Sequence, residues 1–239
     1  MQDSVNYEVM GANAWKHAPS LQAMANHRWR LYPSGVRRAL AYRLSERALP
    51  RDTFVAQTVD LADRSDADRT TSGDSIDQAL DTWNIVDTAP HLANALEFDG
   101  EPLTKATEFS GLFSGQLDVV INKKDFDFSV TLFERTAHGE YMQLSYYWAR
   151  ASYVSDRRHR RLLEPGKRRR LEFRCGRLTS KKLQAGSRLV VVLAVIKQPG
   201  EQINYGSGKD VSDETVADAS EPLRIRWYAD SFIDVPLAG

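Results

Sequence analysis

Cysteine is nearly absent from the sequence, which contains only Cys175 among its 239 residues. A single cysteine excludes a disulfide framework and any zinc site built from several cysteines, and it leaves the cellular compartment open. Long apolar runs are also missing: the longest, residues 189–196, is far too short to span a bilayer, so we expect no membrane partner. The sequence also has no net charge, because 32 basic residues balance 32 acidic ones. No overall positive electrostatic field therefore attracts nucleic acid.

Motifs for catalysis and ligand binding are equally scarce. Residues 111–115 come closest to the G-x-S-x-G sequence of a serine nucleophile, but they place Ser114 one position late. Residues 206–209 resemble the end of a phosphate-binding loop without its leading glycine, so they indicate a glycine-rich turn. The acidic residues after Asp60 lack EF-hand spacing, which leaves a different calcium site only as an alternative to a solvated loop. We expect no catalytic residue, no metal site and no cofactor in this chain.

The N-terminal half shows few regular patterns. Residues 5–10 predict a short apolar strand, which a loop at residues 11–20 follows, while residues 40–50 fit a helix or a strand equally well. Between residues 60 and 101, eleven acidic residues accompany two arginines, a composition typical of a long polar surface loop. Within this insertion the sequence favours a short helix after Asp74, because Ile76, Leu80 and Trp83 recur at helical spacing.

Alternation of apolar and polar residues begins after residue 101 and predicts β-strands. The apolar positions are Leu117, Val119 and Ile121; Phe126, Phe128, Val130 and Leu132; Leu144, Tyr146 and Trp148; Leu171, Phe173 and Cys175; and Leu223, Ile225 and Trp227. Residues 189–196 form a continuous apolar run, suited to a strand buried on both faces. With turns between these strands and no helical crossover, the pattern predicts a mainly β chain. We expect a jelly-roll β-sandwich over residues 100–239 with the N-terminal strand and the polar insertion packed onto it.

The most conspicuous chemical feature is a basic segment at residues 157–182. Clustered arginines suggest phosphate binding, but neither interleaved aromatic residues nor a groove-entering helix accompanies them. Arg170, Glu172 and Arg174 alternate with apolar residues, as on the solvent face of an antiparallel strand. The segment therefore indicates a solvated face, or a docking surface for a partner domain or for the acidic insertion of the same chain or of a second copy. We expect no nucleic acid partner, and a homo-oligomer stays open.

Aromatic residues support a further hypothesis, because many jelly rolls bind carbohydrate on aromatic platforms. Core packing is the default role for each of these side chains. Tyr147 lies on the face opposite to Tyr146 and Trp148, so it is the aromatic residue that we least expect to be fully buried. A carbohydrate-binding platform that includes Tyr147 therefore remains an alternative function.

Seven segments, in order along the chain, carry a recognisable sequence pattern. They are VNYEVMGANAW (5–15), FDGEPLTKATEFSG (98–111), DFDFSVTLFE (125–134), RASY (150–153), EPGKRRRLEF (164–173), LQAGSRLVV (183–191) and INYGSGKDVSDET (203–215). Together they resemble the C-terminal domain of the CocE/NonD hydrolases, the group of cocaine esterase, α-amino-acid ester hydrolase, glutaryl acylases and X-Pro dipeptidyl-peptidases. The first segment is similar to V-x-x-F-V-M-G-x-N-x-W-R, with Lys16 in place of the arginine. The resemblance is weakest between residues 18 and 97.

The resemblance implies a single galactose-binding-domain-like jelly roll over residues 1–239, with an N-terminal strand at 5–15, an acidic insertion at about 60–100 and the main sandwich at 100–239. In the family, the Ser, Asp and His of the triad lie in an α/β-hydrolase domain that precedes the first segment, and no position here corresponds to them. We therefore expect a chain that is inactive alone and packs on an upstream α/β-hydrolase catalytic domain, where it helps to wall the acyl pocket. Asn13 and Trp15 are candidates for that interface, although Trp15 is equally suited to a core position. The alternative is a free-standing jelly-roll module that binds carbohydrate or another ligand.

Overall fold

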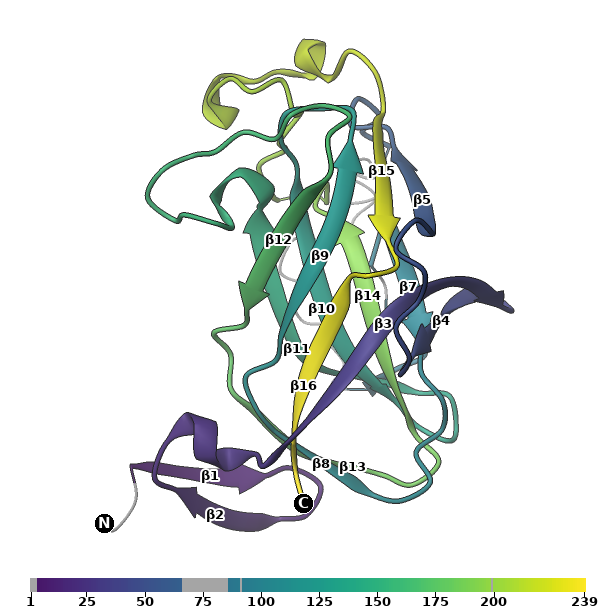
Figure 1. Cartoon of the computed structure of the whole chain (residues 1–239), viewed down its shortest axis with the longest axis vertical. Helices are drawn as coiled ribbons and strands as arrows, with labels where there is room; N and C mark the ends of the chain where they lie inside the picture. The colour runs from purple at the N-terminus through teal and green to yellow at the C-terminus, as the bar shows by residue number, and fades with distance from the viewer. Residues whose placement is uncertain (1–3, 66–85, 91, 199) are drawn as a thin grey trace, which may run out of the picture.

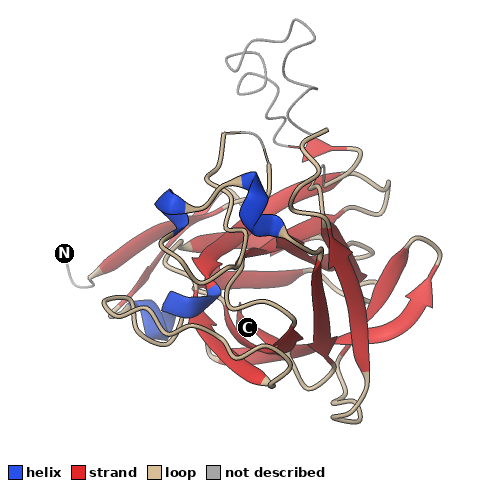
Figure 2. Cartoon of the chain, turned by 90° about the horizontal axis from the view of Figure 1, so that it is seen from above, coloured by secondary structure: helices blue, strands red, loops and turns tan. Residues whose placement is uncertain are grey.

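The computed structural model describes the whole chain except residues 1–3, 66–85, 91 and 199. Two β-sheets lie face to face and form a sandwich (Figures 1 and 2). The front sheet, nearest to the viewer in Figure 1, contains β12, β9, β15, β5, β16, β3, β8 and β13, and the rear sheet contains β6, β11, β10, β14, β7 and β4. β3 pairs with β16 in the front sheet and with β4 in the rear sheet, so it connects the two layers.

The regular elements are mostly short strands. Their bounds are β1 (Val5–Val9), β2 (Ala14–Ala18), η1 (Leu21–Met24), β3 (His27–Arg38), β4 (Ala41–Ser45), β5 (Phe54–Val59), β6 (Val86–Asp87), β7 (Ala95–Asp99), β8 (Thr107–Gly111), β9 (Ser114–Ile121), β10 (Asp127–Arg135), β11 (Tyr141–Arg150), η3 (Ala151–Tyr153), β12 (Arg169–Arg174), β13 (Thr179–Leu183), β14 (Arg188–Val195), η4 (Val211–Asp213), η5 (Val216–Ala219), β15 (Leu223–Tyr228) and β16 (Phe232–Ala238). No helix in the described part of the chain is long and apolar enough to cross a membrane. The fold is the mainly β jelly-roll sandwich that the alternation predicts.

The core lies between the two sheets, where alternate side chains of both layers meet. In β9 the predicted inward residues Leu117, Val119 and Ile121 are at most 1% exposed. β14 is buried on both faces, as its continuous apolar sequence predicts: Leu189 belongs to the core between the sheets, and Val190 belongs to a second apolar cluster. Burial on both faces explains why this strand needs no polar positions.

Several strands lie where the sequence predicts other structure. β2 occupies part of the expected loop at 11–20, and β4 resolves the open choice at 40–50 in favour of a strand. β7 lies inside the stretch 60–100 that we expected to be a surface loop, and it pairs with β14 and β4 in the rear sheet. Its sequence is ALEFD, and Phe98 is completely buried in the main core, so this part of the stretch is not a surface loop. The helix expected near residues 74–83 lies outside the described residues.

A bulge in β11 changes the faces to which its aromatic residues point. In the pairing of β10 with β11, Leu132 lies opposite Ser145 but Phe133 lies opposite Gln143, so one residue is extra. Such a bulge exchanges the two faces of the strand beyond it. Tyr147 accordingly packs inward without being fully buried, whereas Trp148 is 42% exposed. The face assignment from simple alternation, with Trp148 inside and Tyr147 outside, is therefore wrong.

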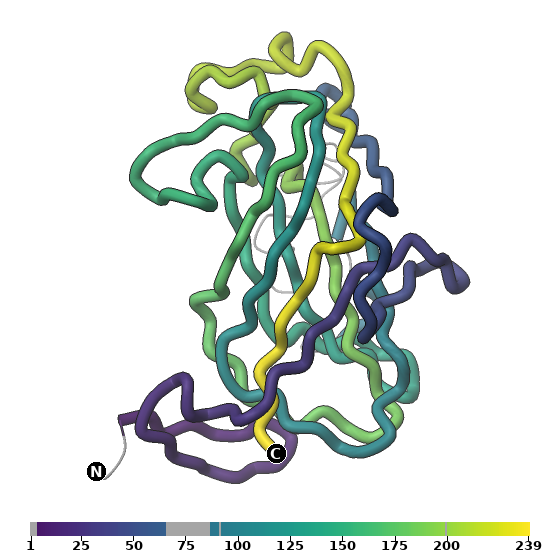
Figure 3. The backbone as a smooth tube through the Cα atoms, in the orientation of Figure 1, coloured from purple at the N-terminus to yellow at the C-terminus, as the bar shows by residue number. Residues whose placement is uncertain are grey.

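The hairpin of β1 and β2 forms a separate two-stranded sheet at one end of the sandwich (Figure 3). It packs over a small apolar cluster of its own, which includes Tyr7, Val9 and Met24. Two backbone hydrogen bonds join it to β13: the amide of Met10 donates to Ser180 (3.1 Å) and the amide of Lys182 donates to Met10 (2.9 Å). The hairpin is thus attached to the sandwich but contributes little to the main core.

Candidate functional site

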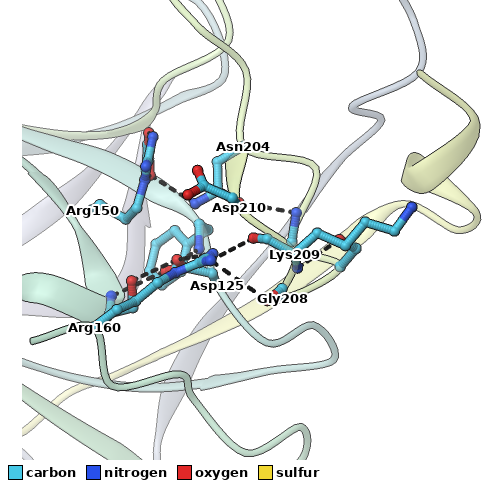
Figure 4. Close-up of polar contacts among 12 residues, drawn as sticks. Asp125, Arg150, Arg160, Asn204, Gly208, Lys209 and Asp210 are labelled. Carbon is cyan, nitrogen blue, oxygen red and sulfur yellow. Dashed lines mark hydrogen bonds and ion pairs between the residues drawn. The ribbon is translucent and has the colours of Figure 1, made fainter. Parts of the chain in front are cut away.

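Three of the recognisable segments meet in one polar network at the end of the sandwich opposite to the β1–β2 hairpin (Figures 1 and 4). Asp125 and Asp127 come from the segment 125–134, Arg150 comes from 150–153, and Asn204 comes from 203–215. Arg160, from the loop between η3 and β12, completes the group. Residues far apart in the sequence therefore cross-link the loops at this end.

Asp125 is the centre of this network and is completely buried. One carboxylate oxygen accepts hydrogen bonds from the backbone amides of Phe126 and Ser152, each at 3.0 Å. The other accepts from the hydroxyl of Ser152 at 2.6 Å and from the guanidinium of Arg160 at 3.1 Å. Arg160 also donates to the carbonyls of Gly208 and Lys209. Each oxygen of Asp125 thus has two donors, as the burial of a carboxylate requires.

A second ion pair lies beside the first. Nε and Nη2 of Arg150 donate to the two carboxylate oxygens of Asp127 at 2.9 and 3.0 Å, and Asn204 donates to the same carboxylate at 2.8 Å. The hydrogen bond to Asp127 raises the pKa of Arg150 above its ordinary value, although partial burial opposes the shift. This two-point contact fixes the orientation of the guanidinium. The pair therefore fixes the end of β10 against β11.

The glycine-rich segment 206–209 forms a tight turn against this network, as its sequence predicts. Gly206 has φ +77°, and a Cβ there would lie 2.7 Å from the carbonyl oxygen of Asp125. The amides of Tyr205 and Ser207 both donate to Glu214 at 2.8 Å, which closes the loop on itself. The network therefore holds the loops at this end in one arrangement, with its carboxylates bonded to guanidiniums, amides and a hydroxyl.

The candidate interface residues Asn13 and Trp15 lie on the β1–β2 hairpin. Asn13 has φ +49°, a left-handed conformation that asparagine tolerates in tight turns. Trp15 is 70% exposed, so the alternative of a core position is wrong for this residue. Beside it, Lys16 makes an ion pair of 2.7 Å with Glu108 of β8, which holds the hairpin against the sandwich. The hairpin therefore exposes a large indole that packs on nothing within the main core.

Tyr147, the third candidate, lies elsewhere, on β11. Its ring stacks on Phe173 of β12 with 4.7 Å between centroids, and burial raises the pKa of its hydroxyl. It lines a recess of about 320 Å³ together with Trp148, Tyr153 and Arg157, among others. The structure thus places Tyr147 in a pocket of its own rather than in one site with Asn13 and Trp15.

The basic segment 157–182 is partly neutralised by carboxylates of the sandwich. Arg168 and Arg170 lie 3.4 and 3.5 Å from Asp118 on β9, and Lys181 lies 3.3 Å from the buried Glu134. Arg170 is exposed, as the alternation in β12 predicts for its solvent face. Sequence analysis missed Asp118 as a partner, because its side chain comes from a different strand. Docking between the basic segment and the acidic insertion stays a prediction.

Sequence reasoning also missed the Asp125 network. The signal was present in part: Asp125, Ser152 and Asn204 all lie in segments that carry the family resemblance. Arg160 lies in none of them and was visible only as one of many arginines. Spacing alone could not join these residues, because their contacts depend on how distant loops come together.

Comparisons with known proteins agree with this architecture. Residues 2–221 match the family described as the X-Pro dipeptidyl-peptidase C-terminal non-catalytic domain. No curated protein matches the sequence. Among solved structures, an aminopeptidase from a marine sediment archaeon, Thaumarchaeota archaeon, superposes with a TM-score of 0.78 at 17% identity, and an α-amino acid ester hydrolase superposes with 0.77 at 18%. A CocE/NonD family hydrolase from Staphylococcus aureus gives 0.62 at 14%.

The extent of these matches is uneven. The chain is covered over 97–99% of its own length, yet it spans only about 40% of each of the three structures. The fold and the comparisons define a β-sandwich domain of a non-catalytic class. More specifically, the chain belongs to the X-Pro dipeptidyl-peptidase C-terminal non-catalytic domain family.

Proposed function

We propose that this chain serves as the non-catalytic C-terminal domain of a serine hydrolase of the α/β-hydrolase type, which cleaves esters, amides or X-Pro peptides. The observation that carries the proposal is the family match over residues 2–221 of the chain. In this role the domain packs on the catalytic domain and helps to shape its acyl pocket. The nucleophile, base and oxyanion hole come from that catalytic domain.

The exposed hairpin is the element we propose for this interface. Tryptophan is among the residues most enriched at the energetic centre of protein interfaces, because its large ring loses much hydration when it is covered. Trp15 is 70% exposed, and Met10 on the same hairpin is 40% exposed. Asn13, in the turn between them, is exposed, and its amide can add hydrogen bonds of defined direction to such an apolar contact. Covering this surface is the most direct use of an indole that the domain itself leaves in water.

An immunoblot of source-cell lysate, with an antibody raised against this chain, tests the proposal. A native polypeptide far larger than 27.0 kDa is the expected result, because the catalytic domain belongs to the same chain. The isolated chain should not turn over p-nitrophenyl esters or X-Pro-nitroanilides. A native band at 27 kDa, or turnover by the isolated chain that a serine-directed inhibitor abolishes, contradicts the proposal.

The interface itself has a sharper test in the full-length hydrolase. We expect Trp15→Ala to lower turnover and to increase protease cleavage between the domains, while leaving the melting temperature of the isolated chain unchanged. Leu40→Ala is the matched control, because Leu40 is 96% exposed at the tip between β3 and β4. Equal effects of the two substitutions would contradict the proposal that the hairpin forms part of the interface.

One observation favours a second candidate function, a carbohydrate-binding module. The recess beside Tyr147 combines three aromatic rings with the guanidinium of Arg157, a composition that can stack against and hydrogen-bond a sugar. Trp148→Ala is the cleaner test, because Tyr147 also packs on the core and its loss would perturb folding. Saturable glycan binding that Trp148→Ala abolishes supports this function, and an empty glycan screen opposes it.

A further inference from the structure

A second recess lies on the outward face of the front sheet, where η1 folds over the ends of β3, β9 and β16. Its volume is about 400 Å³, within the usual range of small-molecule sites. Its lining includes the backbone of Gly111, the ring of Pro236 and the small side chain of Ser114, while Arg28 and Arg174 contribute guanidiniums. None of these residues belongs to the polar network, the hairpin or the pocket beside Tyr147.

Strand register places the polar residues of this recess side by side. Ser114 of β9 lies opposite Arg174 of β12 on one side and opposite Asp234 of β16 on the other. Because neighbouring strands are about 4.8 Å apart, the Cα atoms of Arg174 and Asp234 lie about 10 Å apart with the serine between them. Arg28 lies opposite Pro236, two residues further along β16, and closes the other side of the recess.

The recess contains more positive than negative charge. Its one carboxylate, Asp234, is occupied by Arg30, whose Nε and Nη2 donate to the two oxygens at 2.7 Å each. Arg28 reaches Asp234 only at 3.5 Å, and its side chain is 69% exposed. Among the residues that the structure describes, Arg174 has no ion-pair partner and the hydroxyl of Ser114 has no hydrogen bond. Two guanidiniums and one hydroxyl therefore have free donors in the same recess.

Position 111 keeps the lining of the recess compact. Gly111 has φ +137°, and a Cβ there would lie 3.0 Å from Cγ of Pro236, so a larger residue would push against the proline ring. Glycine at this position lets the backbone pass close to Pro236 without filling the adjacent space. The recess thus combines a small-residue lining with cationic walls.

We propose that this recess binds a small molecule through an oxyanion, either a carboxylate or a phosphate group. The guanidiniums of Arg28 and Arg174 hold the anion from two sides and the hydroxyl of Ser114 donates a third hydrogen bond. Planar guanidiniums match both kinds of oxyanion, since each offers paired donors to paired oxygens. Because Arg30 already neutralises Asp234, the incoming anion meets no free carboxylate. The proposal is independent of the hydrolase role, because it uses neither the hairpin nor a catalytic domain.

Titration of the whole chain with inorganic phosphate and, separately, with N-acetylglycine tests the proposal at low ionic strength. Calorimetry or amide chemical shifts should show saturable binding of at least one anion, with affinity that falls as salt is added. Arg174→Gln should weaken binding about tenfold or more, as the loss of a charged hydrogen-bond donor implies. Which of the two anions binds more tightly identifies the group that the natural ligand carries.

Two further variants separate this site from general charge effects. Arg226→Gln is the matched control, because Arg226 lies on the same outward face, over the ring of Phe54, but outside the recess. It should leave the affinity unchanged. Arg28→Lys keeps the charge but removes the paired donors, so it should weaken binding while the melting temperature stays near that of the wild type. Non-saturable binding of both anions, or an Arg226→Gln effect as large as that of Arg174→Gln, overturns the proposal.

Discussion

Asp125 is a charged side chain without access to water, and its two oxygens accept four hydrogen bonds. Moving a carboxylate out of water is unfavourable by several kcal/mol, and only a full set of donors with a paired cation offsets that cost. Arg160, which supplies the cation, is itself mostly buried, with 19% of its side chain exposed. Each member of the pair is therefore tolerated only because the other is present.

Asp125→Asn removes the negative charge while keeping the shape, and it leaves Arg160 uncompensated. We expect it to lower the free energy of unfolding by about 3–5 kcal/mol, the usual effect of removing one partner of a buried pair. Urea denaturation measures the change. Glu164→Gln, in an exposed pair with Lys167, is the control and should change stability by less than about 1 kcal/mol. A loss for Asp125→Asn no larger than that of the control would contradict the central role of this carboxylate.

The buried carboxylate of Asp99, on β7, should make the stability of the folded chain depend on pH. Burial raises its pKa above the ordinary value of 3.8, although Arg135 donates to one oxygen at 2.5 Å, and the other oxygen has no partner. Between pH 3.8 and the raised folded-state pKa, the folded chain holds a proton that the unfolded chain has released, so stability falls as pH rises. Wild type should therefore lose stability relative to Asp99→Asn as pH increases through this window.

Glu101 should contribute a pH dependence of stability opposite in sign to that of Asp99. Hydrogen bonding to Arg38 lowers the pKa of this exposed carboxylate below 4.5, so any stability it contributes is lost as pH falls. Urea denaturation of wild type, Asp99→Asn and Glu101→Gln at several pH values separates the contributions of the two carboxylates to the pH dependence of stability. A wild-type advantage over Asp99→Asn that grows with pH would show that burial does not dominate at Asp99.

At the scale of elements, alternation located several strands of the main core, although β5, whose residues also alternate between exposed and buried, was not predicted. The strands β9, β10, β12 and β15 follow directly from their sequences. β3 does not, because HRWRLYPSGVRR contains a proline and a glycine, and its partner in β16 lies some two hundred residues away. Trp148 shows a different limit: a bulge exchanges the faces of a strand without leaving any mark in the apolar pattern. The resemblance predicted the fold, but it could not predict which distant side chains meet.

A substitution at Gly115 tests how tightly the front sheet is packed. A Cβ at this position would lie 2.5 Å from the carbonyl oxygen of Phe232 and 2.8 Å from the ring of Phe173. We expect Gly115→Ala to destabilise the chain by about 1–3 kcal/mol, because backbone on one side and the core ring on the other cannot both move. Thermal unfolding measures it. Gly176→Ala, which has open space around the added methyl, should stay within about 0.5 kcal/mol of wild type.

The whole molecule combines a large sandwich with a small appended hairpin, and the two should differ in local stability. An isolated two-stranded sheet is marginally stable, and β1 and β2 bury only a small apolar cluster of their own. By contrast, β10 and β14 pair along eight residues each in the centre of the rear sheet. In hydrogen exchange followed by mass spectrometry, peptides from residues 5–18 should exchange well before peptides from residues 127–135 and 188–195. Equal protection would mean that the hairpin unfolds only with the sandwich.

The pairing of β3 with β16 has a consequence for biosynthesis. Arg30 and Asp234 contact each other across 204 positions of sequence, and β15 pairs with both β5 and β9. The front sheet therefore stays incomplete until residues 232–238 have left the ribosome, and a nascent chain that stops before residue 223 leaves β9 without its partners β15 and β16. All-β topologies with such distant contacts fold in milliseconds to seconds, because long loops must close before their contacts form. Termination before residue 223 should thus produce an aggregating chain rather than a slightly weakened domain.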